Sequence, residues 1–150
     1  MTDDLPAGVM VFPLREIPDA RGAVLHMLRA DAGHFHGFGE VYFSETRPGM
    51  IKAWKRHQRQ TQHLAVPIGR VEFVLADDRT TSPTRGTIAR LILGRPDRYA
   101  LLVIPPRLWY GWRALGDTTA LIANCADLPH DPSESETALE PGTLGPVDWH

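Results

Sequence analysis

A chain of 150 residues with a formal net charge of −2 is long enough for one domain with its own core, and it lacks the basic excess that would draw it to nucleic acid or an anionic membrane. Its single cysteine, Cys125, excludes an internal disulfide and fits a reducing cytoplasm. No apolar stretch has the length of a membrane span, and the acidic start MTDDLPAG lacks the basic and apolar parts of a signal peptide. We therefore expect one cytoplasmic domain over residues 1–150, with neither nucleic acid nor a membrane as partner.

Short apolar runs separated by turn signals follow one another along the chain. Residues 1–8 are expected to form a loose arm, and the Gly- and His-rich residues 30–39 a loop. Apolar runs that predict strands fall within residues 8–18, 19–30, 40–46, 50–57, 62–68, 70–78, 87–93, 99–105 and 119–126. Seven or more short strands at roughly ten-residue spacing are typical of an all-β sandwich or barrel.

Charged residues interrupt the strand expected at residues 50–57. Lys55 and His57 are two residues apart, so their side chains leave the strand on the same face. Lys52 has the opposite parity and joins them only if a bulge or bend intervenes. These side chains either cover a solvated strand face or reach into a pocket, and only the second arrangement would support chemistry.

The spacing around these residues follows two motifs of the cupin superfamily. The first, G-x5-H-x-H-x(3,4)-E-x6-G, is matched in spacing by Gly49, Lys55, His57, Gln62 and Gly69. The second, P-x-G-x-x-H, is matched in spacing by Pro105, Arg107 and Tyr110. The chain thus resembles the cupins, and the resemblance implies an all-β jelly roll of the double-stranded β-helix type.

Three of the four metal-binding positions in that pattern carry other residues here. Lys55 replaces the first His, Gln62 replaces the Glu, and Tyr110 replaces the last His. A protonated ammonium cannot coordinate a metal, and a neutral amide is a poor ligand for zinc, iron or nickel. We therefore expect no metal and no other cofactor.

Further stretches resemble the dTDP-4-dehydrorhamnose 3,5-epimerases, an enzyme family within the cupins. They are DARG at 19–22, SPT at 82–84, IPP at 104–106, and DLPHDPSESE at 127–136 with a Trp near the end. The resemblance runs over roughly residues 15–149. It implies a homodimer that acts on a nucleotide-linked sugar.

The resemblance also implies contacts with the substrate. Arg21 matches an arginine that contacts the nucleotide, often across the dimer interface. Lys52 matches an arginine that helps to hold the sugar or phosphate, and His26 falls where a Glu contacts the ligand. Asp77 and Arg79 match the family's V-D-x-R pair, and we expect them to form a structural ion pair.

The catalytic positions of the family are mostly changed. Lys55 falls where the family keeps its catalytic His, Gln62 where it keeps a catalytic Lys, and Leu128 or Pro129 where it keeps the general-acid Tyr. The Asp that orients the catalytic His has no secure match, although Glu140 is a candidate. Residues 133–136, SESE, are expected to form a solvated loop or the start of a short helix.

Epimerisation beside a ketone needs a base for an acidic C–H, an acid to return a proton, and a positive group near the enolate oxygen. Lys55, His57 and Tyr110 could supply these parts, with His57 as the base because imidazole titrates near neutrality. The residues expected to contact substrate are Arg21, His26, Lys52, Gln62 and Trp112.

The favoured function is an isomerase that enolises a nucleotide-linked 4-keto-deoxy sugar. The same parts would suit a ketoisomerase that moves the carbonyl along the ring. A catalytically inactive relative that binds a sugar nucleotide, or a cupin isomerase or cyclase for another carbonyl compound, are the alternatives.

Overall fold

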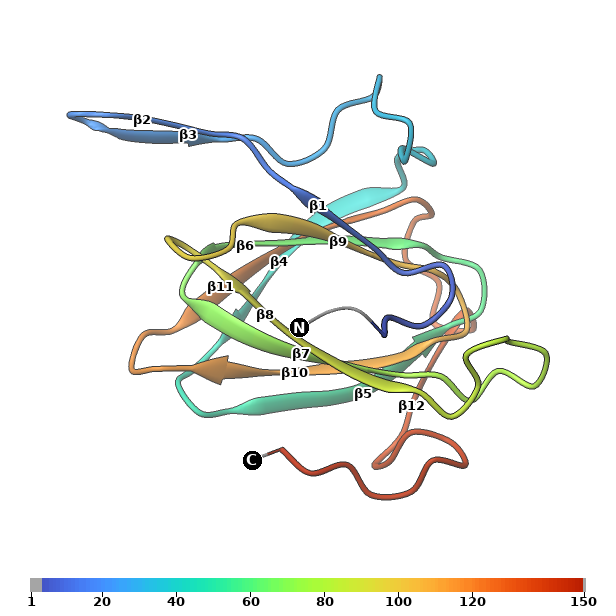
Figure 1. Cartoon of the computed structure of the whole chain (residues 1–150). Coiled ribbons are helices and arrows are strands. Elements are labelled where there is room, and N and C mark those ends of the chain that lie inside the picture. The colour runs from blue at the N-terminus through green and yellow to red at the C-terminus, as the bar shows by residue number, and fades with distance from the viewer. Residues whose placement is uncertain (1–3, 150) are drawn as a thin grey trace.

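The structure is a computed structural model and describes residues 4–149 (Figure 1). The all-β prediction is confirmed, and nowhere in that range does the chain form a helix that could span a bilayer. The strands are β1 Met10–Pro13, β2 Glu16–Asp19, β3 Gly22–Leu25, β4 Glu40–Thr46, β5 Ile51–His57, β6 Gln62–Ile68, β7 Arg70–Ala76, β8 Ile88–Gly94, β9 Ala100–Ile104, β10 Trp109–Leu115, β11 Ala120–Ala126 and β12 Ser135–Thr137.

A long antiparallel ribbon of chain is rolled into two facing sheets. The strands pair in nested order: β4 with β11, β5 with β10, β6 with β9 and β7 with β8. Successive pairs alternate between two five-stranded sheets, ordered β1-β9-β6-β11-β4 and β12-β5-β10-β7-β8. This winding is that of a jelly roll, so the expected architecture is confirmed.

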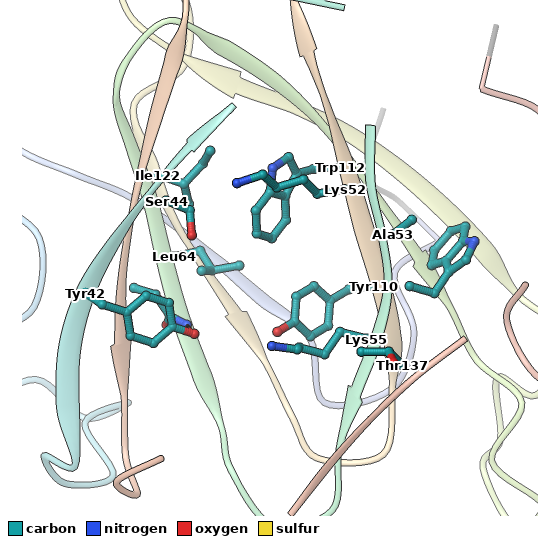
Figure 2. A pocket seen from close by; sticks show the side chains of 12 residues that line it. Tyr42, Ser44, Lys52, Ala53, Lys55, Leu64, Tyr110, Trp112, Ile122 and Thr137 are labelled. Carbon is teal, nitrogen blue, oxygen red and sulfur yellow. Dashed lines mark hydrogen bonds between the residues drawn. The ribbon is translucent and has the colours of Figure 1, made fainter. Parts of the chain in front are cut away.

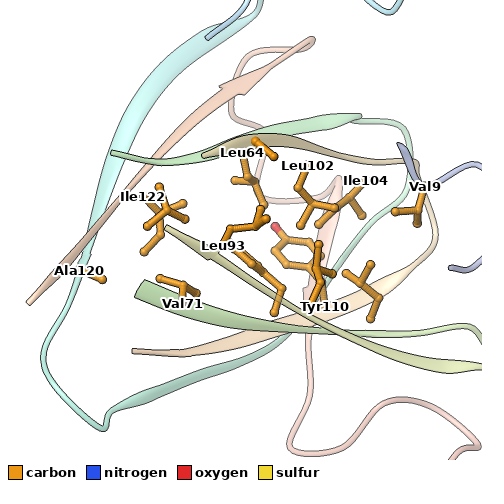
Figure 3. Packing of buried hydrophobic residues seen from close by; sticks show 14 of the residues in the cluster. Val9, Leu64, Val71, Leu93, Leu102, Ile104, Tyr110, Ala120 and Ile122 are labelled. Carbon is orange, nitrogen blue, oxygen red and sulfur yellow. The ribbon is translucent and has the colours of Figure 1, made fainter. Parts of the chain in front are cut away.

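The inner faces of the two sheets enclose the main core (Figure 3). Phe73 and Leu75 from β7 share this core with Leu102 and Ile104 from β9, and each of the four is at most 1 % exposed. Burying such a side chain contributes about 1.5–3 kcal/mol. The ring of Tyr110 belongs to the same cluster, so packing fixes where its hydroxyl lies.

The last stretch of the chain covers the outer face of the sheet that contains β5. Val147 and Trp149 pack against Trp54 and Trp109, and the rings of Trp54 and Trp149 are 5.4 Å apart. Earlier in the same stretch, β12 adds to the edge of this sheet beside β5. The C-terminal segment is therefore fixed to the sheet at both places.

The prediction of a loose arm is wrong for the part of it that is described. Leu5 packs against the main core, Pro6 is buried, and the amide of Ala7 donates to Thr84 Oγ1 at 2.8 Å. An apolar side chain and a paired backbone amide hold this segment against the sandwich. Residues 1–3 lie outside the described residues.

Asp77 is the centre of a structural cluster at the end of β7. Its carboxylate accepts hydrogen bonds from Arg79, Ser82 and Thr84 at 2.6–3.1 Å. Burial alone would raise the pKa of this carboxyl, but these donors hold the pKa far below its ordinary value. The expected structural ion pair of Asp77 and Arg79 is confirmed.

A hairpin of β2 and β3 projects away from the sandwich (Figure 1). Ile17 and Val24 on this hairpin are 39 % and 59 % exposed. Arg21, at its tip, bonds only its neighbour Asp19 among the contacts of the described residues, at 2.7 Å. The hairpin therefore presents apolar and cationic groups that its own sandwich does not use.

Gly69 is the single residue between β6 and β7, where the chain passes from one sheet to the other. Its φ is +83°, and a Cβ atom there would lie 2.8 Å from Ala120 Cα. We expect Gly69→Ala to lower the free energy of unfolding by about 1–3 kcal/mol from left-handed strain, and by more from the contact. Chemical denaturation measures this loss. Gly116→Ala is the control, because Gly116 also has a positive φ, +75°, but has open space around it. Equal losses would contradict a role for the contact with Ala120.

Candidate active site

A cavity of about 320 Å³ lies between the sheets, with walls from β4, β6 and β11 of one sheet and from β5 and β10 of the other (Figure 2). Aliphatic and aromatic groups make up one part of its lining, and amine, amide and hydroxyl groups make up the rest. The lining residues are Tyr42, Ser44, Lys52, Ala53, Trp54, Lys55, Leu64, Tyr110, Trp112, Ile122, Asn124 and Thr137. A pocket of this kind, apolar with a few convergent polar groups, is the usual form of a small-molecule site.

A bulge brings both lysines of β5 into this cavity. Tyr110 of β10 lies opposite Lys55, and Trp112 lies opposite Lys52, so two steps on β10 face three steps on β5. The extra residue reverses the strand's alternation between the two lysines. Lys52 and Lys55 therefore line the same cavity although they are three residues apart on one strand. The bulge that this arrangement was expected to need is present.

Three buried side chains form a hydrogen-bonded chain that ends at the cavity. His57 Nδ1 lies 2.7 Å from Glu134 Oε1, and His57 Nε2 lies 2.9 Å from the Tyr110 hydroxyl. His57 is 6 % exposed, Tyr110 4 % and Glu134 1 %. Because a carboxylate only accepts, Nδ1 carries the proton that it donates to Glu134, and in neutral His57 the Nε2 atom accepts from Tyr110.

The backbone register explains why these three groups meet. Tyr110 is paired with Lys55, which is two residues from His57 along β5, and His57 is paired with Ser135 of β12. Glu134 directly precedes β12, and its second carboxylate oxygen accepts from the amides of Arg59 and Gln60 at 2.6 and 2.8 Å. The turn after β5 thus holds the carboxylate from the other side.

The local environment sets the charge of each member of the chain. Burial alone would raise the pKa of Glu134, but the donors from Arg59, Gln60 and His57 leave this pKa below its ordinary value. Burial lowers the pKa of His57, although Glu134 opposes the shift. Burial raises the pKa of Tyr110 well above its ordinary value. At neutral pH the chain is a carboxylate, a neutral imidazole and a neutral phenol.

A second hydrogen-bonded network of amides lies behind the opposite wall. Gln62, 1 % exposed, donates to Gln60 Oε1 at 2.8 Å and accepts from Asn124 Nδ2. Asn124 also donates to the Tyr42 hydroxyl at 2.8 Å. Gln62 itself is not among the cavity-lining residues, so it contacts the site through Asn124 and Tyr42.

A smaller cavity of about 270 Å³ adjoins the first, and both are lined by Tyr42 and Lys55. Its other lining residues are Glu40, His57, Gln60, His130, Asp131, Glu134 and Ser135. Lys55 and His57 both line it, so the expectation that they share one face of β5 is confirmed. Three carboxylates make this second cavity unfavourable for an anionic group.

The remaining candidates divide by location. Lys52, Lys55, Tyr110 and Trp112 line the main cavity, and His57 lies directly behind Tyr110. Arg21 lies on the exposed hairpin, and His26 lines a separate hollow beside Pro13 and Arg29. Within a single protomer, neither residue lies at the main cavity.

Two expectations about the C-terminal region are wrong. Glu134 is buried and Ser135–Thr137 form a strand, so SESE is neither a solvated loop nor a helix start. Glu140 is exposed and accepts from the Val147 amide, so Glu134, not Glu140, orients the imidazole. The oriented imidazole is that of His57, two residues beyond the position where the resemblance put a catalytic His.

Among residues 4–149, no group of three or more His, Cys, Asp and Glu side chains is placed to hold a metal ion. His57 and Glu134, the acid–base pair nearest the cavity, already bond one another and the surrounding protein groups.

Tyr42, Asn124 and Glu134 were not among the site residues expected from the sequence. A hydroxyl and an amide within apolar strand runs were the only local signals for the first two.

Comparisons with known proteins show the family to which this chain belongs. A sequence model of the dTDP-4-dehydrorhamnose 3,5-epimerases matches residues 5–145. A solved dTDP sugar isomerase from Desulfovibrio desulfuricans G20 is 52 % identical with a TM-score of 0.92, over 96 % of this chain and 92 % of that one.

Two further relatives have names from glycan synthesis. The probable low-salt glycan biosynthesis epimerase Agl13 of Haloferax volcanii is 34 % identical over 77 % of this chain and 75 % of its own length. The spore coat polysaccharide biosynthesis protein SpsL of Bacillus subtilis is 32 % identical over 95 % of both chains. With nearly all of its described length matched, the chain belongs to the dTDP-4-dehydrorhamnose 3,5-epimerase family.

Proposed function

We propose that this protein is an isomerase that epimerises a dTDP-linked 4-keto-6-deoxy sugar by enolisation. The observation that carries the proposal is the buried chain from Glu134 through His57 to Tyr110, which ends in the wall of the cavity. Family membership and the dTDP sugar isomerase with 52 % identity support the substrate class. Apolar walls and two lysines suit a deoxy sugar that carries a diphosphate.

The base in this proposal is His57, acting through the Tyr110 hydroxyl. The Tyr110 oxygen takes the proton from the carbon beside the ketone while its own proton passes to His57 Nε2. The C–H electron pair becomes the new C=C bond, and the carbonyl pair moves to oxygen as an enolate. Glu134 stabilises the imidazolium that forms, as a buried carboxylate does for a catalytic histidine.

The two lysines have separate roles in binding and catalysis. Lys55 lies opposite Tyr110 in the strand register and lines the cavity, so its ammonium can stabilise the enolate oxygen. Lys52, one bulge away on the same wall, is suited to the diphosphate. The carboxylates of the second cavity would repel that group, which favours an entry from the Lys52 end.

A purely binding role is disfavoured by the buried acid–base chain. Burying a charged carboxylate beside an imidazole contributes little to stability compared with apolar packing. A binding site would gain nothing from an imidazole oriented toward a phenol. An inactive relative was favoured by the changed family positions at Lys55, Gln62 and Leu128 or Pro129. These changes leave the chain from Glu134 to Tyr110 intact.

We further propose that the protein is a cytoplasmic homodimer. The β2–β3 hairpin exposes Ile17 and Val24 and holds Arg21 out at its tip. Seated on a second protomer, the hairpin would bury these side chains and bring Arg21 toward a bound nucleotide. The buried, unpaired Cys125 fits a reducing compartment.

The function is tested by incubation with dTDP-4-keto-6-deoxyglucose in deuterated water, followed by NMR. We expect solvent deuterium beside the ketone, and we expect His57→Gln to reduce the exchange rate by about 10²–10⁴-fold, because a positioned base is worth that much. His36→Gln, on an exposed loop, is the matched control. No exchange by the wild-type protein, while an active epimerase exchanges the same sample, would overturn the proposal.

The pH dependence of kcat/KM tests the orienting carboxylate. His57 acts as a base when neutral, and burial lowers its pKa, so the acid limb should fall below pH 6.5, the ordinary value for histidine. Glu134→Gln removes the charge that raises this pKa, so the limb should move lower still, while kcat drops about 100-fold or more. Glu136→Gln, which removes a carboxylate that contacts Arg56 and Gln58 but not His57, should keep the wild-type profile. An unchanged limb in Glu134→Gln would refute the assignment.

The oligomer is tested by light scattering of a variant carrying Ile17→Asp and Val24→Asp. Because two carboxylates cannot be buried unpaired in an apolar contact, we expect this variant to be a monomer with its fold retained. Ile92→Asp, at a position 41 % exposed on β8, is the control and should stay dimeric. A monomeric wild-type protein would reject the proposed dimer.

A further inference from the structure

We propose that Tyr42 is the acid of the reaction, donating its phenolic proton to the enolate carbon from the wall opposite Tyr110. The inference rests on the proposed epimerase function and assigns the group that completes it. The family resemblance puts Leu128 or Pro129 where relatives keep a general-acid Tyr, and neither side chain has a proton to give. The group that returns the proton is therefore not the one that the resemblance would supply.

Tyr42 lies on the cavity wall that faces Tyr110. It lies on β4 of one sheet and Tyr110 on β10 of the other, and both line the main cavity. Figure 2 shows the two rings on facing walls with their hydroxyl groups directed toward one another. A planar enolate held between them would present one face to each phenol.

The amide network fixes the direction of the Tyr42 hydroxyl. Gln60 Nε2 donates to the carbonyls of Leu128 and Pro129 at 3.1 and 3.2 Å, so Gln60 Oε1 must be an acceptor. That oxygen accepts from Gln62 Nε2, which leaves Gln62 Oε1 to accept from Asn124 Nδ2. Each amide thus sets the orientation of the next.

Asn124 passes this orientation to Tyr42. Its Oδ1 accepts from the His63 backbone amide at 3.3 Å, which independently confirms that Nδ2 is the donor toward Tyr42. The Tyr42 oxygen is therefore an acceptor for protein, and its own proton is free for a ligand in the cavity. Tyr110 has the opposite arrangement, since its proton points to His57 and its oxygen lone pair remains for the substrate.

The protons removed and returned in this reaction balance between the substrate, the two tyrosines, His57 and solvent. After enolisation, the Tyr42 proton goes to the face of the carbon opposite the one that Tyr110 deprotonated, and the enolate pair reforms the carbonyl. The resulting phenolate is stabilised by Asn124 Nδ2 and by the Lys55 ammonium nearby. Tyr42 and Lys55 also line the second cavity, through which solvent can restore the phenol and remove the proton from His57. Burial raises the pKa of Tyr42, which keeps it a proton donor before the reaction.

Deuterium exchange and inversion are measured separately to test this assignment. In deuterated water, Tyr42→Phe should lower the rate of inversion about 100-fold or more, as expected for loss of a general acid. Exchange into recovered substrate with unchanged configuration should persist, within about tenfold of wild type, because the base on the other wall is intact. Asn124→Asp offers Tyr42 an acceptor in place of a donor, turns its proton away from the cavity, and should give the same pattern.

Tyr99→Phe is the matched control, because the Tyr99 hydroxyl bonds the His26 carbonyl outside the cavity. It should leave both rates at wild-type values, and thermal melting checks that every variant is folded. Inversion by folded Tyr42→Phe at the wild-type rate, or parallel loss of exchange and inversion, would overturn the role of Tyr42. Absence of exchange in the wild-type protein would instead reject the proposed function itself.

Discussion

A buried carboxylate in contact with a buried imidazole constrains the turn after β5 and the C-terminal segment of this molecule. Glu134 is held by His57 and by two backbone amides of the turn after β5, and it directly precedes the strand that pairs with β5. Leaving such a charge without partners would cost about 3–5 kcal/mol, so the turn, β12 and the tail that packs under Trp54 must all be in place together. Packing on the outer face of one sheet thereby fixes a group on its inner side.

The two walls of the cavity differ in the direction of the hydrogen bond that each tyrosine makes. Each presents a phenol, but Tyr110 donates its proton away from the cavity and Tyr42 accepts from the protein behind it. One wall therefore offers a lone pair and the other a proton. The two phenols therefore differ chemically because His57 accepts from one and Asn124 donates to the other.

The sequence predicted the fold and the wall formed by β5 and β10, and it did so for identifiable reasons. The spacing of Lys55 and His57 determined their common face, and the cupin frame brought Tyr110 to them from a distant strand. The sequence showed only that Lys52 would need a bulge to reach the same pocket as Lys55. It could not show that the bulge is there, because strand alternation does not reveal an inserted residue.

Glu134 could not be located from the sequence, since a polar stretch such as SESE is typical of a surface loop. Its burial comes from pairing with β5 and from the tail behind it, neither of which has a local signature. For Arg21 the sequence carries a recognisable motif, whereas the structure of a single chain does not test its expected role. That role involves a second protomer, and among the described residues Arg21 bonds only Asp19.

The amide network has a consequence for how this enzyme can evolve. Gln60, Gln62, Asn124 and Tyr42 form a series in which each side chain is hydrogen-bonded to the next, and most of its members are buried. Changing one member alone leaves a neighbour unsatisfied at a cost of about 1–3 kcal/mol. These positions are therefore epistatic, and a lysine at position 62, which the family resemblance implies for relatives, would require compensating changes at the others.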